Sequence, residues 1–370
     1  MDSKPTEKAI FVNNQDPADL VTGDVSLTLF ITNACNERCE HCFYWEELNT
    51  GRADELSVGE ITRLVDSIGN RLSRVSLTGG EPFVRKDIQD IAKELINRKH
   101  LTTINIVTNG ILQKRVIELV EYILSNDETK TRLLINVSLD GLQEKHDSIR
   151  RVPGSFKKAV ATIRSLKDIS RLHAQMEVSV VSTISKENFD QLVVLNDFVE
   201  KDLHVYHRIN LIRSAKTGVF GVDRGLVEES FSPEWVKPFS ELELTKDQTS
   251  YVVKYFNEKT NWREYHKLIL AYSQRIVEKK KKMFTCNAPY TGLIVYPNGE
   301  FSFCEYIKPL GNLRDYGFSF DNYWHAKESD ERRKALIDCM CNHPCSLGLN
   351  IADNPVLKQL LPEPQIVTAA

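Results

Sequence analysis

Three cysteines, Cys35, Cys39 and Cys42, lie close together near the start of the chain, separated by gaps of three and two residues. Thiolates are soft ligands that suit iron–sulfur clusters. Three of them can bind three irons of a cubane [4Fe–4S] cluster and leave the fourth iron open to a small molecule, whereas a ferredoxin-type run supplies a fourth cysteine. The alternative is a structural zinc site, which closes at four ligands and would here be completed by His41.

The composition sets limits on what surrounds this triplet. The chain has 370 residues and a formal net charge of −3, which gives no electrostatic reason to expect nucleic acid or an anionic membrane as the main partner. No apolar run approaches the length of a membrane span. Residues 1–24 are polar and charged and do not resemble a signal peptide, so we expect a cytoplasmic protein.

The elements that must position the triplet alternate between strands and helices. Stretches with the apolar spacing of helices lie between six β-rich segments. The β-rich segments are residues 25–32, 75–78, 103–108, 133–139, 176–183 and 205–212. Such alternation predicts an α/β fold, a partial (β/α)6 TIM-like barrel with a parallel sheet and right-handed crossovers. In barrels of this kind, chemistry occurs where the strands end.

Unusual residues follow the first four of these segments. The cysteine triplet follows the first, Gly79 and Gly80 the second and Asn109 the third, while Ser138 and Asp140 lie at the end of the fourth. We therefore expect all of them on one rim of the barrel. Ser57 and Glu60 also form a candidate capping box for the first helix.

The rest of the chain is organised differently. We expect an N-terminal arm over 1–24, the barrel over 25–212, a helical connection over 213–285 and a small module over 286–370. In this module, apolar residues flank Pro297-Asn298-Gly299-Glu300, which indicates a β-hairpin, and a helix is expected near Tyr323 to Ile337. The other five cysteines all lie here, and two separate groups of cysteines indicate metal sites rather than disulfides in a cytosolic enzyme; they are Cys286, Cys304, Cys339, Cys341 and Cys345.

Several stretches together resemble the radical S-adenosylmethionine (SAM) superfamily. Besides the triplet, they are Thr78-Gly79-Gly80-Glu81-Pro82, Ser138-Leu139-Asp140-Gly141, His146-Asp147-Ser148-Ile149-Arg150 and Gly154-Ser155-Phe156. The resemblance covers 25–212, and that of 286–345 is to the auxiliary-cluster module called SPASM or twitch. It implies a [4Fe–4S] cluster on the triplet whose open iron binds SAM, cleaves it reductively to a 5′-deoxyadenosyl radical and so removes a substrate hydrogen.

The resemblance also implies residues that bind SAM. Gly79 and Gly80 would let the backbone approach its methionine part, because a Cβ would obstruct it. Glu81 would accept from the methionine ammonium, and Pro82 would stiffen the turn. The remaining contacts follow the family's pattern: Asn109 and Ser138 near the ribose or methionine end, Arg150 on the SAM carboxylate as a bidentate fork, and His41 near the adenine, where relatives often have an aromatic residue.

In the C-terminal module, Gly299-x4-Cys304 matches the internal signature of these auxiliary-cluster modules. A full SPASM module uses about seven cysteines, so five favour the shorter twitch form with one auxiliary [4Fe–4S] cluster and one spare thiol. The spacing of Cys339, Cys341 and Cys345 departs from the usual pattern, and a structural zinc site also fits these gaps.

The predicted enzyme couples SAM cleavage to oxidation or other handling of a small molecule or a ribosomal peptide, with an electron donor such as flavodoxin or ferredoxin. One alternative is a redox-neutral epimerase in which a spare thiol, Cys339 or Cys341, donates a hydrogen atom. Another is an iron–sulfur electron-transfer protein without SAM chemistry. The first 24 residues are too short for a separate leader-peptide-binding domain, which tilts the prediction towards a small molecule or a peptide recognised by other means.

Overall fold

The computed structural model describes residues 21–45, 47–50, 54–212, 219–220, 237–279, 286–336 and 339–341. Its centre is a largely parallel sheet in which six strands follow one another in sequence order. These strands are β1 (Val25–Phe30), β2 (Leu72–Thr78), β3 (Thr103–Thr108), β4 (Arg132–Ser138), β5 (Met176–Ile184) and β6 (Tyr206–Leu211). Each pairs in parallel with the next, which confirms the predicted partial barrel, and the sheet does not close.

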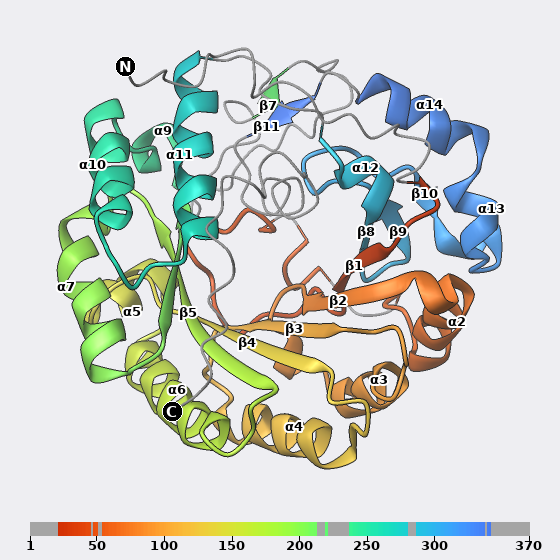
Figure 1. Cartoon of the computed structure of the whole chain (residues 1–370), viewed down its shortest axis with the longest axis horizontal. Coiled ribbons are helices and arrows are strands. Elements are labelled where there is room, and N and C mark those ends of the chain that lie inside the picture. The colour runs from red at the N-terminus through yellow and green to blue at the C-terminus, as the bar shows by residue number, and fades with distance from the viewer. Residues whose placement is uncertain are drawn as a thin grey trace, which may run out of the picture.

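Helices connect these strands and lie outside the arc that they form (Figure 1). They are α2 (Val58–Ile68), α3 (Ile88–Leu95), α4 (Gln113–Asn126), α5 (Glu144–Arg150), α6 (Ser155–Ser170) and α7 (Leu192–Asp197). Short 3₁₀ or π segments adjoin them at Gly69–Arg71, Pro82–Val84, Phe189–Gln191 and Phe198–Asp202. The predicted capping box is confirmed, because Ser57 and Glu60 exchange side-chain to backbone hydrogen bonds at the start of α2.

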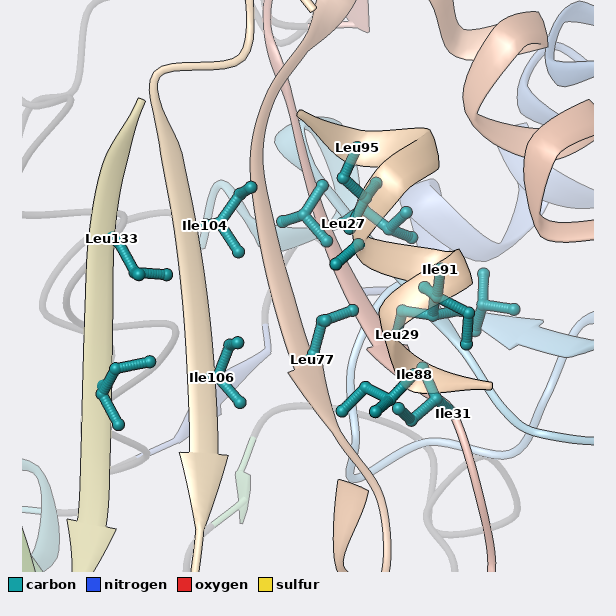
Figure 2. Close-up of a cluster of buried hydrophobic side chains, with 14 of the residues drawn as sticks. Leu27, Leu29, Ile31, Leu77, Ile88, Ile91, Leu95, Ile104, Ile106 and Leu133 are labelled. Carbon is teal, nitrogen blue, oxygen red and sulfur yellow. The ribbon is translucent and has the colours of Figure 1, made fainter. Parts of the chain in front are cut away.

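The two faces of the sheet differ in chemistry. One face is apolar and packs against the helices: Figure 2 shows Leu77, Ile104 and Leu133 on this side, with Ile91 and Leu95 of α3 against the same cluster. The opposite face, called the inner face from here on, carries the alternate residues of each strand. Because side chains in a strand alternate between faces, Asn105 of β3 and Asn136 of β4 belong to the inner face.

The C-terminal residues extend the same sheet. The predicted hairpin is confirmed as β8 (Gly292–Val295) and β9 (Glu300–Ser302), followed by β10 (Gly311–Asn312). The sequence did not indicate that β8 pairs in parallel with β1, which joins the hairpin to the barrel sheet. Strand-edge pairing between distant segments has no local sequence signal, so only the structure could reveal this contact.

Other elements lie around this sheet. The predicted helix near Tyr323 to Ile337 is two helices, because the chain turns between them. The remaining elements are β7 (Val219–Phe220), α9 (Phe239–Leu242), α10 (Lys246–Asn257), α11 (Glu264–Lys279), α12 (Ala288–Thr291), a 3₁₀ turn (Leu313–Tyr316), α13 (Phe320–Trp324), α14 (Lys327–Ala335) and β11 (Met340–Cys341). None of the helices in the described part of the chain combines the length and apolar character needed to cross a bilayer.

Candidate active site

The cysteine loop begins where β1 ends and is held by the neighbouring strand ends. Gly80 N donates to Thr32 O at 2.8 Å, and Glu81 N donates to Ala34 O at 2.8 Å. On the other side, Glu40 N donates to the carbonyl of Ile149 in α5 at 3.0 Å. The loop is therefore fixed by backbone hydrogen bonds to both the end of β2 and α5.

The three thiols lie near one another within this loop. Cys39 is buried, Cys35 and Cys42 are partly exposed, and none of them forms a disulfide. Burial is the main cause that raises the pKa of Cys35 to about 12, and the charges of the neighbouring acids add to it. A bound metal would have to displace these protons, since the thiolate is the form that binds metal.

The glycine pair after β2 makes a close contact with this loop. A Cβ on Gly79 would meet the carbonyl oxygen of Thr32, and one on Gly80 would meet that of Ala34, inside normal van der Waals separation in both cases. Gly79 also has a φ of +133°, which side chains rarely adopt. Glycine is therefore required at both positions because the turn after β2 approaches the backbone of the cysteine loop too closely for a side chain.

Glu81 is a buried carboxylate that joins two strand ends. Its Oε1 accepts from Thr108 Oγ1 at 2.8 Å and from Phe83 N at 3.1 Å, and its Oε2 accepts from Asn109 N at 2.7 Å. Burial raises its pKa to about 7, against the effect of these hydrogen bonds. Pro82 begins the short 3₁₀ turn that follows.

Asn109 carries this connection on to the cysteine loop. Its Nδ2 donates to Asn36 Oδ1 at 2.6 Å, and its Oδ1 accepts from Ile111 N at 3.0 Å. Ser138 is the last residue of β4, where it pairs with Val181 of β5 on the inner face. Both residues therefore lie at the carboxyl ends of their strands, on the same rim as the cysteines.

Arg150 lies inside a buried charge network beside the thiols. Its Nε and Nη2 contact Asp140 Oδ2 at 2.6 Å and 2.5 Å, and its Nη1 donates to Glu37 Oε2 at 3.1 Å. The same Nη1 lies 3.5 Å from Cys39 Sγ. Burial alone would raise the pKa of Asp140, but Arg150 and then His41 hold it below its usual range.

His41 and His146 complete this network. His41 Nε2 lies 3.6 Å from Asp140 Oδ2, and His146 Nδ1 accepts from Asp140 N at 3.1 Å. The ring of His41 thus faces Asp140. Burial lowers the pKa of His41, and it lowers the pKa of His146 to about 4.

The sequence placed Asp140 on the rim but assigned it no role, and it did not identify Glu37 as a site residue. Glu37 stands between two of the thiols. A signal existed, because an acidic residue inside a short cysteine loop needs a partner if it is buried. The partner, Arg150, is 113 residues away from Glu37, so the sequence could not supply the pairing.

The late cysteines lie in separate elements. Cys286 precedes α12, Cys304 follows β9, and Cys339 is buried against the main core without forming a disulfide. Cys341 is in β11 but its side chain is not among those described, and Cys345 lies outside the described residues. The predicted auxiliary site therefore remains a prediction.

Comparison with known proteins identifies the family of the barrel. The family model described as the radical SAM superfamily matches residues 29–198, which include the cysteine loop and the strand ends around it. The chain carries a radical SAM domain.

Curated relatives agree with this domain. The sporulation killing factor maturation protein SkfB of Bacillus subtilis is 28% identical over 181 residues, 48% of this chain and 39% of SkfB. The antilisterial bacteriocin subtilosin biosynthesis protein AlbA of the same organism is 23% identical over 307 residues, 77% of this chain and 56% of AlbA. The chain thus matches 39% of the length of SkfB and 56% of the length of AlbA.

Solved structures share the fold. The crystal structure of Streptococcus suis SuiB bound to S-adenosylmethionine superposes with a TM-score of 0.57 at 15% identity, covering 84% of this chain and 68% of SuiB. SuiB bound to the precursor peptide SuiA gives a TM-score of 0.53 at 15% identity, covering 83% and 67%. The likeness in fold therefore extends beyond residues 29–198.

The donor set of the cysteine loop suits an iron–sulfur cluster, because its three thiols are soft ligands. Glu37 Oε1 is also buried with no hydrogen-bond partner within the described parts of the chain, which leaves an acceptor beside the thiols.

Proposed function

We propose that this protein is a radical SAM enzyme in which Cys35, Cys39 and Cys42 hold a [4Fe–4S] cluster that binds SAM. The observation that carries the proposal is one loop with three thiols, fixed by the ends of β2 and α5 within a radical SAM domain. When bound, the cluster and SAM would supply a 5′-deoxyadenosyl radical able to remove a hydrogen atom from a substrate.

The chain's own residues have three tasks in this proposal. Glu81 and Asn109 hold the strand ends and the cysteine loop in one geometry, and Arg150 places a positive charge next to Cys39. A nearby guanidinium favours the thiolate form that binds iron. The rim residues Asn109, Ser138, His41 and Arg150 are the proposed contacts of SAM, together with the Gly79–Pro82 turn.

We further propose that residues 286–370 hold one auxiliary [4Fe–4S] cluster on four of the five late cysteines. The proposal rests on the cysteine pattern and on the likeness to SPASM or twitch modules. An auxiliary cluster would place an electron acceptor in the molecule and so favour net oxidation of the substrate. SkfB is named for the maturation of a sporulation killing factor and AlbA for the biosynthesis of a bacteriocin, and SuiB was solved with the precursor peptide SuiA; these relatives support a peptide as the substrate here.

The proposal is tested by purifying the protein without oxygen and measuring iron and SAM cleavage. The wild type should bind about eight irons, four per cubane, and release 5′-deoxyadenosine on addition of dithionite and SAM. The triple variant Cys35→Ala, Cys39→Ala, Cys42→Ala should retain about four irons and release none.

Cys304→Ala is the matched control, because it removes one late thiol and leaves the triplet intact. It should still release 5′-deoxyadenosine when reconstituted. Equal behaviour of the wild type and the triple variant would overturn the proposed function.

A further inference from the structure

Three arginines surround one carboxylate at the amino ends of β4, β5 and β6. Arg132 Nη2 lies 2.5 Å from Glu177 Oε2, Arg263 Nη1 lies 2.9 Å from Glu177 Oε1, and Arg208 Nη2 lies 3.6 Å from the same oxygen. These four residues are called the arginine group below. Among the described residues, no second carboxylate forms an ion pair with any of the three arginines, so the arginine group has an excess of two positive charges.

The arginine group is held in place by its neighbours. The guanidinium of Arg263 stacks over the ring of Tyr206 at 4.4 Å, and the Tyr206 hydroxyl in turn contacts His266 Nδ1 at 2.8 Å. Arg208 Nε is buried and has no hydrogen-bond partner within the described parts of the chain. Positioned guanidinium groups with unused donors are typical of sites that bind carboxylate or phosphate.

The strand register places the arginine group on the inner face. Glu177 and Ser179 are two residues apart on β5, and Leu134 and Asn136 of β4 are their paired neighbours. Arg132 precedes Leu134 by two residues, so it shares this face as well. Arg208 pairs with Val181, two residues beyond Ser179, which puts it on the same face of β6.

The inner face between the arginine group and the rim is polar. Hydrogen bonds link Ser76, Asn105, Asn136 and Ser179 side by side across four strands: Asn105 donates to Ser76, Asn136 donates to Asn105, and Ser179 donates to Asn136. A closed barrel usually fills this space with layers of branched apolar side chains. A polar face that joins the rim to the arginine group favours a polar molecule lying along it.

We propose that the arginine group binds an acidic side chain or terminal carboxylate of an extended peptide substrate whose reacting residue lies at the rim. This inference deepens the proposed function and rests on it. Glu177 lies four residues before Val181, the strand partner of Ser138, so the carboxylate of the arginine group lies about 13 Å along the strand from the rim at 3.3 Å per residue, while the Cα of Arg208 is in register with Val181. A peptide in extended form covers this distance in about four residues.

In this proposal, Glu177 occupies the arginines until the substrate carboxylate arrives. Removing Glu177 should therefore strengthen binding of an external carboxylate, which a purely structural ion pair would not do. The two probes are synthetic peptides that differ in one group, acetyl-Gly-Ser-Gly-Ser-Gly-Glu-amide and its Gln counterpart. Dissociation constants are measured by ligand-observed NMR on the full chain, with no SAM turnover needed.

We expect the Glu peptide to bind the wild type about tenfold more tightly than the Gln peptide, since charge-assisted hydrogen bonds are roughly twice as strong as neutral ones. Glu177→Gln should tighten binding of the Glu peptide by about tenfold, and Arg263→Gln should weaken it by about tenfold. Arg132→Gln is a second variant, because the side chain of Arg132 is half exposed, and it should also weaken binding of the Glu peptide.

Arg171→Gln is the matched control, because Arg171 is an exposed arginine of the α6 end that pairs with Asp168 on the outside of the barrel. It should leave both dissociation constants unchanged. Equal binding of the two peptides, or no effect of Arg263→Gln, would overturn the inference. Tighter binding of inorganic phosphate than of the Glu peptide at the same arginines would also overturn the inference and would indicate a phosphorylated small molecule as the ligand. Failure of the proposed function would show in SAM cleavage and not in these binding constants.

Discussion

The two ends of the inner face hold their charges in opposite balance. At the rim, one arginine, Arg150, meets two carboxylates, Asp140 and Glu37, and all three side chains are at most one tenth exposed. At the other end, three arginines meet Glu177, and their side chains are between 25% and 54% exposed. Arginine and carboxylate side chains are therefore used differently at the two ends. At the rim they form a buried network beside the cysteine loop, and at the other end they form a partly exposed group in which arginines outnumber the carboxylate.

Gly80→Ala is expected to have the largest effect, and it acts on the rim alone. The new Cβ would collide with the carbonyl oxygen of Ala34, a backbone atom that cannot rotate away. We expect the free energy of unfolding to fall by about 4 kcal/mol or more, and the triplet to lose its iron. Urea denaturation and iron analysis measure both effects.

Gly59→Ala is the control, since Gly59 lies in α2, where an added Cβ would have nothing within 4 Å, and the change should stabilise the fold by up to about 1 kcal/mol. A Gly80→Ala protein with full iron content and unchanged stability would show that the glycine contact does not shape the cysteine loop. The rim would then be no more rigid than the opposite end.

Arg150→Met tests whether the rim network is structural. It leaves two carboxylates, Asp140 and Glu37, buried without their cation, and breaking a buried pair in this way costs about 3–5 kcal/mol. Arg263→Gln at the other end should cost less than about 1 kcal/mol, because the side chain is half exposed and Glu177 keeps two arginines. Urea denaturation measures the loss in unfolding free energy for both variants. Similar losses would contradict the conclusion that only the network at the rim is structural.

The sequence predicted one end of this comparison and not the other. The cysteine spacing, the glycine turn and the strand ends could be read locally, because each lies within a short segment next to an apolar strand. The arginine group is composed of Arg132, Glu177, Arg208 and Arg263, which belong to three strands and a helix start. Its residues meet only through the register of β4, β5 and β6, and no local pattern encodes that register.

The same reason explains why the partners of Arg150 could not be predicted. The proposed contact of Arg150 with the SAM carboxylate stays a prediction, and the structure adds that its guanidinium contacts Asp140 and Glu37. The sequence could indicate that an arginine stands in the site, yet its long-range partners depend on how α5 packs against the cysteine loop. The glycine pair was likewise predicted to approach a ligand. The structure adds that both glycines lie against backbone carbonyl oxygens of the cysteine loop, where a side chain would collide.

The two ends should also lose stability in different ranges of pH. Burial and the charge of Arg150 lower the pKa of His146 to about 4, so the folded state resists a proton that the unfolded state accepts below about 6.5. The free energy of unfolding should therefore fall as the pH drops from 6.5 to 4, by on the order of 3 kcal/mol.

At the other end, burial would raise the pKa of Glu177, but Arg263 and Arg132 lower it to about 2. This carboxylate stabilises the fold above its unfolded pKa of about 4.3, and that contribution is lost as the pH falls towards 2. His146→Gln should flatten the dependence of unfolding free energy on pH between 6.5 and 4, and Glu177→Gln should flatten it below 4.3. Identical pH profiles for the two variants would mean that the ends are not independent.

Arg314→Gln is expected to have the smallest effect. It tests whether the contact between the C-terminal residues and the barrel influences either end of the inner face. Arg314 Nε donates to Glu60 Oε1 at 2.8 Å, so it links the capping box of α2 to the segment after β10. The side chains are 36% and 17% exposed, so we expect a loss of about 0.5–1 kcal/mol in urea denaturation at pH 7.

Because the hydrogen bond from Arg314 is the main cause that lowers the pKa of Glu60 to about 2, this loss should shrink as the pH falls from about 4.3 towards 2. Lys114→Gln, which removes an exposed pair with Glu118 on α4, should change stability by less than about 0.5 kcal/mol. Iron content and peptide binding should match the wild type in both variants. If Arg314→Gln lowered either one, then the β8 junction beside β1 would transmit strain to the inner face, and the rim and the arginine group could no longer be treated as separate from the C-terminal strands.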